Sequence, residues 1–244
     1  MPSHTPPSRG HVMANQPGSS KEYHLITAPG TAGLAPHILL EMNYEMNGAA
    51  YQLTLINLRE GDQKKPDFLK LNPLGRVPVL VLPNGDPMVE SAAITMTLAR
   101  SCPSMNLIPP TSNETQYAYW DQWLVFLTNS VQADLMIAKR PERLIPGTEP
   151  EQLAAQKAAS AGATARVENY FNVIGEHLKD HGPYMLGDAI SAPDIYLAMV
   201  CRWARELPKP PRTHQAIANL LDKIDALPAV KAVLKQEGLE GPLA

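Results

Sequence analysis

Apolar and polar positions follow two different periods in the first part of the chain. EYHLITA (22–28) is a short apolar run that predicts a strand, and LAPHILLEMN (34–43) has the apolar spacing of a helix. YQLTLINL (51–58) alternates between apolar and polar residues, which is the period of a half-buried strand. The predicted order is therefore strand, helix, strand.

A second pair of strands is predicted after a polar segment. VPVLVLPNGDPMVES contains two apolar runs, 77–82 and 87–89, separated by Asn84 and Gly85. Both of these residues tolerate the positive φ of a type I′ turn, so the dipeptide predicts a hairpin. A helix is predicted next, at 91–101. These elements together predict a thioredoxin-like α/β domain.

The remainder of the chain, after the linker CPSMNLIPPTSN, has helical periodicity. Ser191 and Asp194 have the spacing of a capping box at the start of one helix. Two apolar stripes are predicted to be buried: Trp120, Leu124, Leu127, Val131 and Leu135; and Val167, Tyr170, Phe171, Ile174 and Leu178. The helix that the capping box starts is predicted to run through Ile195, Ala198, Met199 and Trp203.

The amino-acid composition limits the kinds of protein that this chain can be. The chain has 244 residues, is 44% apolar and carries a net charge of -3, which indicates an ordinary globular protein with no attraction to nucleic acid. It contains no apolar run long enough for a membrane span, so we expect a cytoplasmic protein. Cys102 and Cys201 are expected to be buried thiols, and we expect no metal site. We expect a disordered leader at 1–21 and two domains, 22–103 and 113–244.

Four stretches of the chain belong to one known pattern: NPLGRVPVLVLPNG (72–85), ESAAI (90–94), GDAISAPDIYLAMVCRW (187–203) and LPAVKAVLKQEGL (227–239). Together they resemble the soluble glutathione transferase family. Within that family, PGTAGLAPHILLE and the KQEGL ending resemble the bacterial beta class. The resemblance implies a thioredoxin-like α/β N-terminal domain, an all-α C-terminal domain, glutathione as cosubstrate and a homodimer packed across the two domains.

The resemblance also implies a glutathione site. Val77 would hold the cysteinyl part through its backbone N–H and C=O, and Pro78 is expected to be cis. Glu90 and Ser91 would receive the γ-glutamyl end at a helix start, where backbone N–H groups favour an anion. The alternative is that Pro78 only shapes the hairpin and Ser91 only caps a helix.

Three basic residues flank this expected cleft. Lys64, Lys65 and Arg76 are candidates to meet the glycyl carboxylate of glutathione, and the same residues are also consistent with solvated surface charges. His37, inside the first helix, matches a His of the beta class. We expect it to be a packed and hydrogen-bonded residue rather than a catalyst.

The sequence departs from the beta class at its sulfur-directed positions. Ala32 stands where the class has Cys, Gly33 where it has Ser, and Thr27 where it has Tyr. Protein-thiol redox chemistry at this turn is therefore not expected. A hydroxyl can instead hold the glutathione thiolate, and Thr31 and Thr27 are the candidates. Thr31 is equally consistent with a plain N-cap of the first helix.

The second domain departs in the same direction. After Trp123-Leu124-Val125-Phe126, the family's Glu, His and Lys are replaced by neutral side chains, Ser130, Gln132 and Ala133. Val125, Gln132, Ala133 and Met136 would then form a mostly neutral wall for an apolar electrophile.

Three functions stay open on these residues. One is a glutathione transferase-like enzyme that adds the thiolate to an apolar electrophile, or isomerises or eliminates through it. The second is a glutathione-independent enzyme on the same fold, for example for a dehydration or cyclisation. The third is a non-catalytic binding protein, because fold alone does not decide function.

Overall fold

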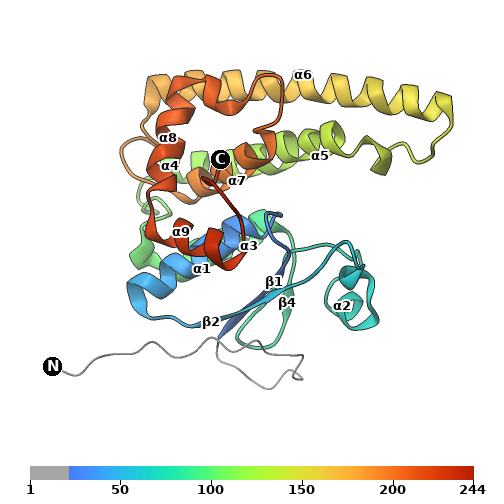
Figure 1. Ribbon diagram of the computed structural model, residues 1–244. Helices are drawn as coiled ribbons and strands as arrows, with labels where there is room; N and C mark the ends of the chain where they lie inside the picture. The colour runs from blue at the N-terminus through green and yellow to red at the C-terminus, as the bar shows by residue number, and fades with distance from the viewer. Residues whose placement is uncertain (1–21) are drawn as a thin grey trace.

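The computed structural model describes residues 22–244, so the predicted leader at 1–21 lies outside the described residues. Figure 1 shows an α/β part with a helical part stacked on it. The α/β part contains β1 (Tyr23–Thr27), α1 (Leu34–Asn47), β2 (Tyr51–Leu55), η1 (Asp62–Lys64), α2 (Pro66–Leu71), β3 (Val79–Val81), β4 (Pro87–Met88) and α3 (Ser91–Ser101). This order confirms the predicted thioredoxin-like unit.

The sheet has four strands in the order β2-β1-β3-β4. β1 and β2 are parallel, as a helical crossover between them requires, whereas β3 runs antiparallel to both of its neighbours. Ile26 is paired with Val79, and Leu80 with Met88. The start of β3 therefore lies beside the end of β1 and the end of β4, and these three chain segments meet at one edge of the sheet.

The hairpin between β3 and β4 forms, but its predicted turn type is wrong. Gly85 has φ 92°, whereas Asn84 is not among the residues with positive φ. Gly85 N–H donates to Leu82 C=O, so Pro83 occupies the first central position of the turn. A proline ring holds φ near about −65°, which a type I′ turn cannot accept at that position.

The helical part is built around α7, most of whose side chains are buried. The predicted capping box at its start is present, with Ser191 N–H and O–H both donating to the Asp194 carboxylate. The elements are η2 (Pro103–Met105), α4 (Glu114–Phe126), η3 (Leu127–Gln132), α5 (Ala133–Lys139), η4 (Pro141–Arg143), α6 (Pro150–His181), α7 (Ala192–Ala204), η5 (Pro211–Thr213), α8 (Gln215–Asp225) and α9 (Pro228–Gln236).

The stripe from Trp120 to Leu135 is buried as predicted, but the helix that carries it is not a regular α-helix throughout. Residues Leu127–Gln132 form a π-helical segment between α4 and α5. π-helical segments are rare in proteins, and those that occur often lie at functional sites. The wider turn changes the direction of Gln132 and the residues after it relative to Val125.

The chain returns to the α/β part at its end. α9 packs along α1, so the last helix, red in Figure 1, lies against the first, blue. Leu243 is fully buried, and Arg202 of α7 donates to the carbonyls of Pro242 and Leu243. No helix within residues 22–244 is long and apolar enough to cross a membrane.

Candidate functional site

The predicted glutathione-binding residues gather at the sheet edge where β1, β3 and β4 meet. Val77 and Pro78 immediately precede β3, and the bond between them is cis, as predicted. The backbone N–H and C=O of Val77 make no hydrogen bond within residues 22–244. An extended backbone with both groups unpaired can accept a ligand as an additional strand.

Glu90 and Ser91 follow β4 at the same edge. Glu90 has φ 72° and ψ 106°, a conformation that a residue with a side chain rarely adopts, and such strain is concentrated at functional sites. Ser91 begins α3 with its side chain turned inward, so the alternative reading of Ser91 as a helix cap is wrong. The first N–H groups of α3 have no partner inside the helix and are available to an anion.

The Ser91 hydroxyl is joined to the helical part through a buried tyrosine. Ser91 Oγ lies 2.7 Å from the phenol oxygen of Tyr196 on α7, and Tyr196 O–H donates to Gln132 Oε1. Burial raises the pKa of Tyr196, so the phenol stays protonated and acts as the donor to Gln132. Ser91 must then donate to Tyr196. One hydrogen-bonded chain thus joins a predicted glutathione residue to a predicted substrate residue.

The turn before α1 holds its two threonine hydroxyls together. Thr31 O–H donates to Ala28 C=O at 2.7 Å, and the oxygens of Thr27 and Thr31 are 3.1 Å apart. The alternative reading of Thr31 as an N-cap is wrong, because α1 begins at Leu34 with Gly33 in the N-cap position and no capping side chain. Thr27 is fully buried, whereas Thr31 is partly exposed. Of the two, Thr31 is the one that a ligand can reach.

The side chain of Thr27 packs against the backbone of Gly33. A Cβ on Gly33 would lie 2.0 Å from Thr27 Oγ1 and 2.6 Å from Thr27 Cβ, so the threonine occupies the space that a side chain at Gly33 would need. The N–H groups of Ala32 and Gly33 make no hydrogen bond within the described part of the chain. These two amides at the start of α1 are the unpaired donors that the turn offers.

Of the three candidate basic residues, Lys65 forms an ion pair with Asp62. Lys64 and Arg76 lie on segments that touch: Lys64 ends η1, and Arg76 belongs to the loop before β3. A Cβ on Gly75 would lie 3.0 Å from the carbonyl oxygen of Gln63, so the loop and η1 are packed closely. Both side chains are exposed, and neither forms an ion pair with another described residue. Their role toward a carboxylate stays a prediction.

The four predicted wall residues have different surroundings. Val125 is 56% exposed on α4, Ala133 is exposed at the start of α5, and Met136 is partly buried. Gln132, the last residue of the π-helical segment, is the one that contacts the chain from Ser91 through Tyr196. The substrate wall as a whole stays a prediction.

His37 is a packed residue, as predicted. It is fully buried, with Nδ1 2.8 Å from Glu237 Oε1 and Nε2 3.0 Å from Gln236 Oε1. Tyr51 lies 3.1 Å from the same Nε2. Both partners from the KQEGL stretch come from the end of α9, so the histidine joins the two ends of the chain rather than facing a ligand.

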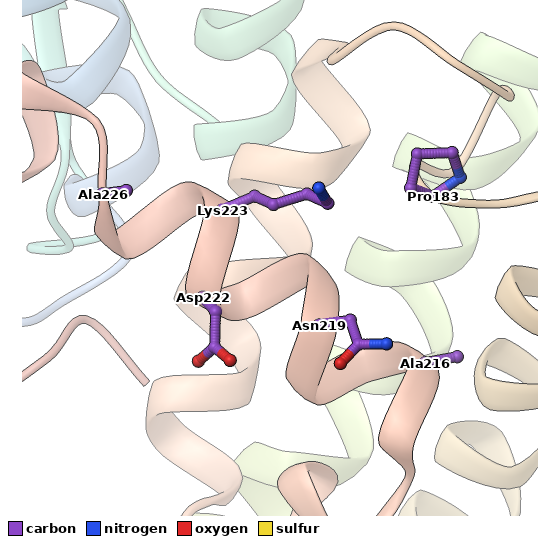
Figure 2. Close-up of a pocket in the computed structure, with 6 residues that line it drawn as sticks. All are labelled: Pro183, Ala216, Asn219, Asp222, Lys223 and Ala226. Atoms are coloured by element: carbon purple, nitrogen blue, oxygen red, sulfur yellow. The ribbon is translucent and has the colours of Figure 1, made fainter.

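One hollow lies along α8, away from this sheet edge. It has a volume of about 500 Å³, and its wall is formed by Pro183, Ala216, Asn219, Asp222, Lys223 and Ala226. Figure 2 shows three polar side chains of α8 at this hollow, all of them exposed. None of the predicted site residues lines it, so we assign the site on the sheet edge. Among residues 22–244 there is no group of three or more His, Cys, Asp or Glu placed to hold a metal ion.

Two family models match the chain. Residues 42–101 match the glutathione S-transferase N-terminal domain, and residues 157–236 match the glutathione S-transferase C-terminal domain. The chain belongs to the glutathione S-transferase family. The predicted family and the predicted fold are thereby both confirmed.

Individual members of the family match over most of the chain. Glutathione S-transferase GstA of Escherichia coli O157:H7 is 28% identical over 88% of this chain and 99% of its own length. A sphingomonad glutathione S-transferase solved in complex with glutathione is 28% identical, with a TM-score of 0.73 over 89% of this chain and 100% of that one. The bacterial beta class enzyme of Sphingomonas chungbukensis gives the same identity, TM-score and coverage.

Sequence reasoning missed two residues of this glutathione S-transferase fold. Tyr196 lies in the DIYLA stretch directly after the capping box, but nothing in the spacing indicates that its hydroxyl crosses to Ser91. Trp203 is predicted only as a residue of the helix that follows the capping box, yet its indole N–H donates to Gly30 C=O at 2.9 Å. Contacts between residues so far apart in the chain carry no local sequence signal.

Proposed function

We propose that the chain binds glutathione at the sheet edge and directs its thiolate at an apolar electrophilic small molecule. The sulfur forms a bond to an electrophilic carbon, and the displaced electron pair leaves with a leaving group or is protonated. Isomerisation and elimination use the same thiolate, which is then released. That the protein is a glutathione transferase-type enzyme follows from its family. That its second substrate is an apolar electrophile is our proposal.

The observation that carries the proposal is the meeting of three features at one edge. These are the unpaired backbone of Val77 before cis Pro78, the strained Glu90 and the free N–H groups at the start of α3. They match the parts of glutathione in order. Val77 would pair with the cysteinyl backbone, and α3 and Glu90 would receive the γ-glutamyl carboxylate and ammonium. The relative that was solved with glutathione supports the same ligand.

The thiolate would be held without a protein thiol. The position of the beta-class cysteine is Ala32, and both cysteines of the chain are buried. Burial raises the pKa of the Cys201 thiol, which makes it a poor nucleophile. We assign the contact to the N–H groups of Ala32 and Gly33 and to the Thr31 hydroxyl. Thr27 supports Thr31 from behind.

The Thr31 hydroxyl donates to Ala28 C=O, so under this proposal its proton turns toward the sulfur when glutathione binds. A hydroxyl rotates readily, and a charge-assisted bond to a thiolate is stronger than a neutral bond to a carbonyl. Lys64 and Arg76 would bind the glycyl carboxylate. Val125, Gln132, Ala133 and Met136 would form the neutral side of the electrophile site.

We further propose that the protein acts as a cytoplasmic homodimer. Support comes from large apolar side chains that stay exposed on the described surface, among them Leu74 at 69%, Leu144 at 60% and Met46 at 53%. Large exposed apolar side chains, where they are contiguous, favour an interface between proteins. Light scattering of the purified protein measures this directly, and a monomer at all concentrations tested contradicts it.

Calorimetric titration with glutathione tests the proposed function. We expect wild type to bind and Ser91→Ala to bind roughly tenfold more weakly, since the variant disturbs the start of α3 and leaves Tyr196 without its donor. Ser101→Ala is the matched control at the far end of the same helix, where the hydroxyl donates to Leu98 C=O. Absence of binding to wild type and Ser91→Ala at millimolar glutathione overturns the proposal.

The glutathione-independent reading is favoured by one observation. Both threonine hydroxyl protons of the turn are used within the protein, Thr31 toward Ala28 and Thr27 toward Thr31. A reaction that needs no thiolate would leave them there. The discriminating result is turnover of a substrate at an unchanged rate when glutathione is omitted.

A further inference from the structure

Gly30, in the turn before α1, is held on both sides by the helical part. Its N–H donates to Glu237 Oε2 at 2.7 Å, and its C=O accepts from the Trp203 indole N–H at 2.9 Å. Gly30 has φ 67°, and the Leu239 side chain lies 3.5 Å from the position of a Cβ. The backbone of this turn is therefore fixed by residues from the far end of the chain.

Glu237 uses its second oxygen on His37. Oε1 of Glu237 lies 2.8 Å from Nδ1 of His37, and both side chains are fully buried. One carboxylate thus bridges the backbone of the turn and the first helix. Because a buried carboxylate is unfavourable without partners, both contacts have to be made together in the folded protein.

The hydrogen bonds around His37 fix the orientation of its ring. The Gln236 amide N–H donates to Glu41 at 2.9 Å, which turns the Gln236 oxygen toward His37 Nε2, and Tyr51 O–H also donates to Glu41. His37 Nδ1 lies against the Glu237 carboxylate. Because the ring is held at both nitrogens, its contact with Glu237 keeps that carboxylate in place.

We propose that Glu237 is a positioning residue for thiolate binding: it fixes Gly30, and through Gly30 the orientation of the Thr31 hydroxyl and the Ala32 and Gly33 amides. This inference rests on the proposed function, because it assigns those donors to the glutathione sulfur. Glu237 itself does not touch the ligand. It acts through the backbone of the turn, and His37 holds its carboxylate in place.

The turn can be tested without any ligand. Hydrogen exchange of the Gly30 amide, measured by NMR, should be slow in wild type and at least roughly tenfold faster in Glu237→Ala. Glu237→Gln keeps an oxygen that can accept from Gly30 and should restore most of the protection, which also guards against a variant that fails to fold. Glu240→Ala is the matched control, an exposed carboxylate three residues further along. A Gly30 amide that exchanges equally fast in wild type and Glu237→Ala overturns the inference.

A second measurement tests whether Glu237 affects binding of the glutathione sulfur. Binding of glutathione is compared with binding of γ-glutamyl-2-aminobutyryl-glycine, in which a methyl group replaces the thiol. We expect Glu237→Ala to weaken glutathione roughly tenfold more than the analogue, equivalent to about one pKa unit of the bound thiol. Glu237→Gln should lie between Glu237→Ala and wild type.

Equal weakening for both ligands, with Gly30 protection lost, makes Glu237 a purely structural residue and overturns the inference. Wild type that binds neither ligand overturns the proposed function and the role of Glu237 toward sulfur with it. The two failures are distinguishable, because Gly30 exchange and analogue binding are measured separately.

Discussion

The hydroxyl of Ser91 lies 2.7 Å from the hydroxyl of Tyr196, and this contact joins the two parts of the molecule at the candidate site. Tyr196 is fully buried, and its own proton goes to Gln132. The start of α3 and the π-helical segment are therefore coupled through one phenol. A change at either end alters the hydrogen bonding of the other.

Replacing Tyr196 by Phe should destabilise the protein by about 1–3 kcal/mol, because it leaves the buried Ser91 donor and the Gln132 acceptor without their partner. Urea unfolding at equilibrium measures the change. Tyr119→Phe is the control, since that side chain is 49% exposed and its hydroxyl has no hydrogen-bond partner among residues 22–244; it should change stability by less than about 0.5 kcal/mol. Equal stability of Tyr196→Phe and wild type contradicts the coupling.

Gly33→Ala should destabilise the fold by about 1–3 kcal/mol, because the new Cβ would lie 2.0 Å from Thr27 Oγ1. The cost should be smaller in a Thr27→Gly background, where that side chain is gone, and a double-mutant cycle measures the difference. The control is Gly162→Ala on α6, where the nearest atom is 3.9 Å away and alanine should stabilise slightly. If the stability changes of Gly33→Ala and Thr27→Gly are additive in the double variant, the close packing of Thr27 against Gly33 is refuted.

Stability should depend on pH through Asp194. Burial raises the pKa of this carboxyl to about 6 from 3.8, so the folded protein takes up a proton at a higher pH than the unfolded chain. The group's contribution is therefore fully present below pH 3.8 and is lost as pH rises through about 6. The stability of wild type relative to Asp194→Asn should increase by about 2 kcal/mol when the pH is lowered from about 7 to about 4. A pH-independent difference between the two proteins contradicts the raised pKa.

Thr31→Val should lower turnover of an apolar electrophile with glutathione by roughly tenfold, corresponding to about one pKa unit of the bound thiol. Thr31→Ser should recover most of the rate, because it returns the hydroxyl. Thr213→Val is the matched control: its hydroxyl donates to Pro210 C=O at 2.7 Å, three residues back, as Thr31 does to Ala28. Steady-state rates at saturating glutathione provide the measurement. Undiminished turnover in Thr31→Val contradicts the role of the Thr31 hydroxyl and means that the backbone N–H groups alone bind the thiolate.

The order of strands and helices was predictable because each element has its own local signal. The periodicity of 22–58 and the helix at 91–101 match β1, α1, β2 and α3 closely. The type I′ turn predicted from Asn84 and Gly85 is wrong, because Pro83 takes the first central position and its ring fixes φ at a negative value. The π-helical segment was not foreseen either, because the apolar spacing across it still reads as an α-helix.

The candidate site was predictable to the extent that its residues lie in short motifs. Val77, Pro78 and Glu90 precede or follow strands whose pairing brings them together. The partners that fix these groups come from far along the chain, such as Tyr196 for Ser91 and Glu237 for Gly30. Because only tertiary packing determines such pairs, the sequence predicts the motif residues but not the hydrogen-bond partners that position them.

The central claim is that this chain activates the thiol of glutathione without a cysteine of its own. The most direct measurement is a pH titration of the thiolate absorbance of bound glutathione, carried out on a Cys102→Ala, Cys201→Ala double variant so that glutathione supplies the only thiol. The account predicts a bound thiol pKa roughly one unit or more below the ordinary value of about 8.5. A bound thiol that titrates at its ordinary pKa contradicts it.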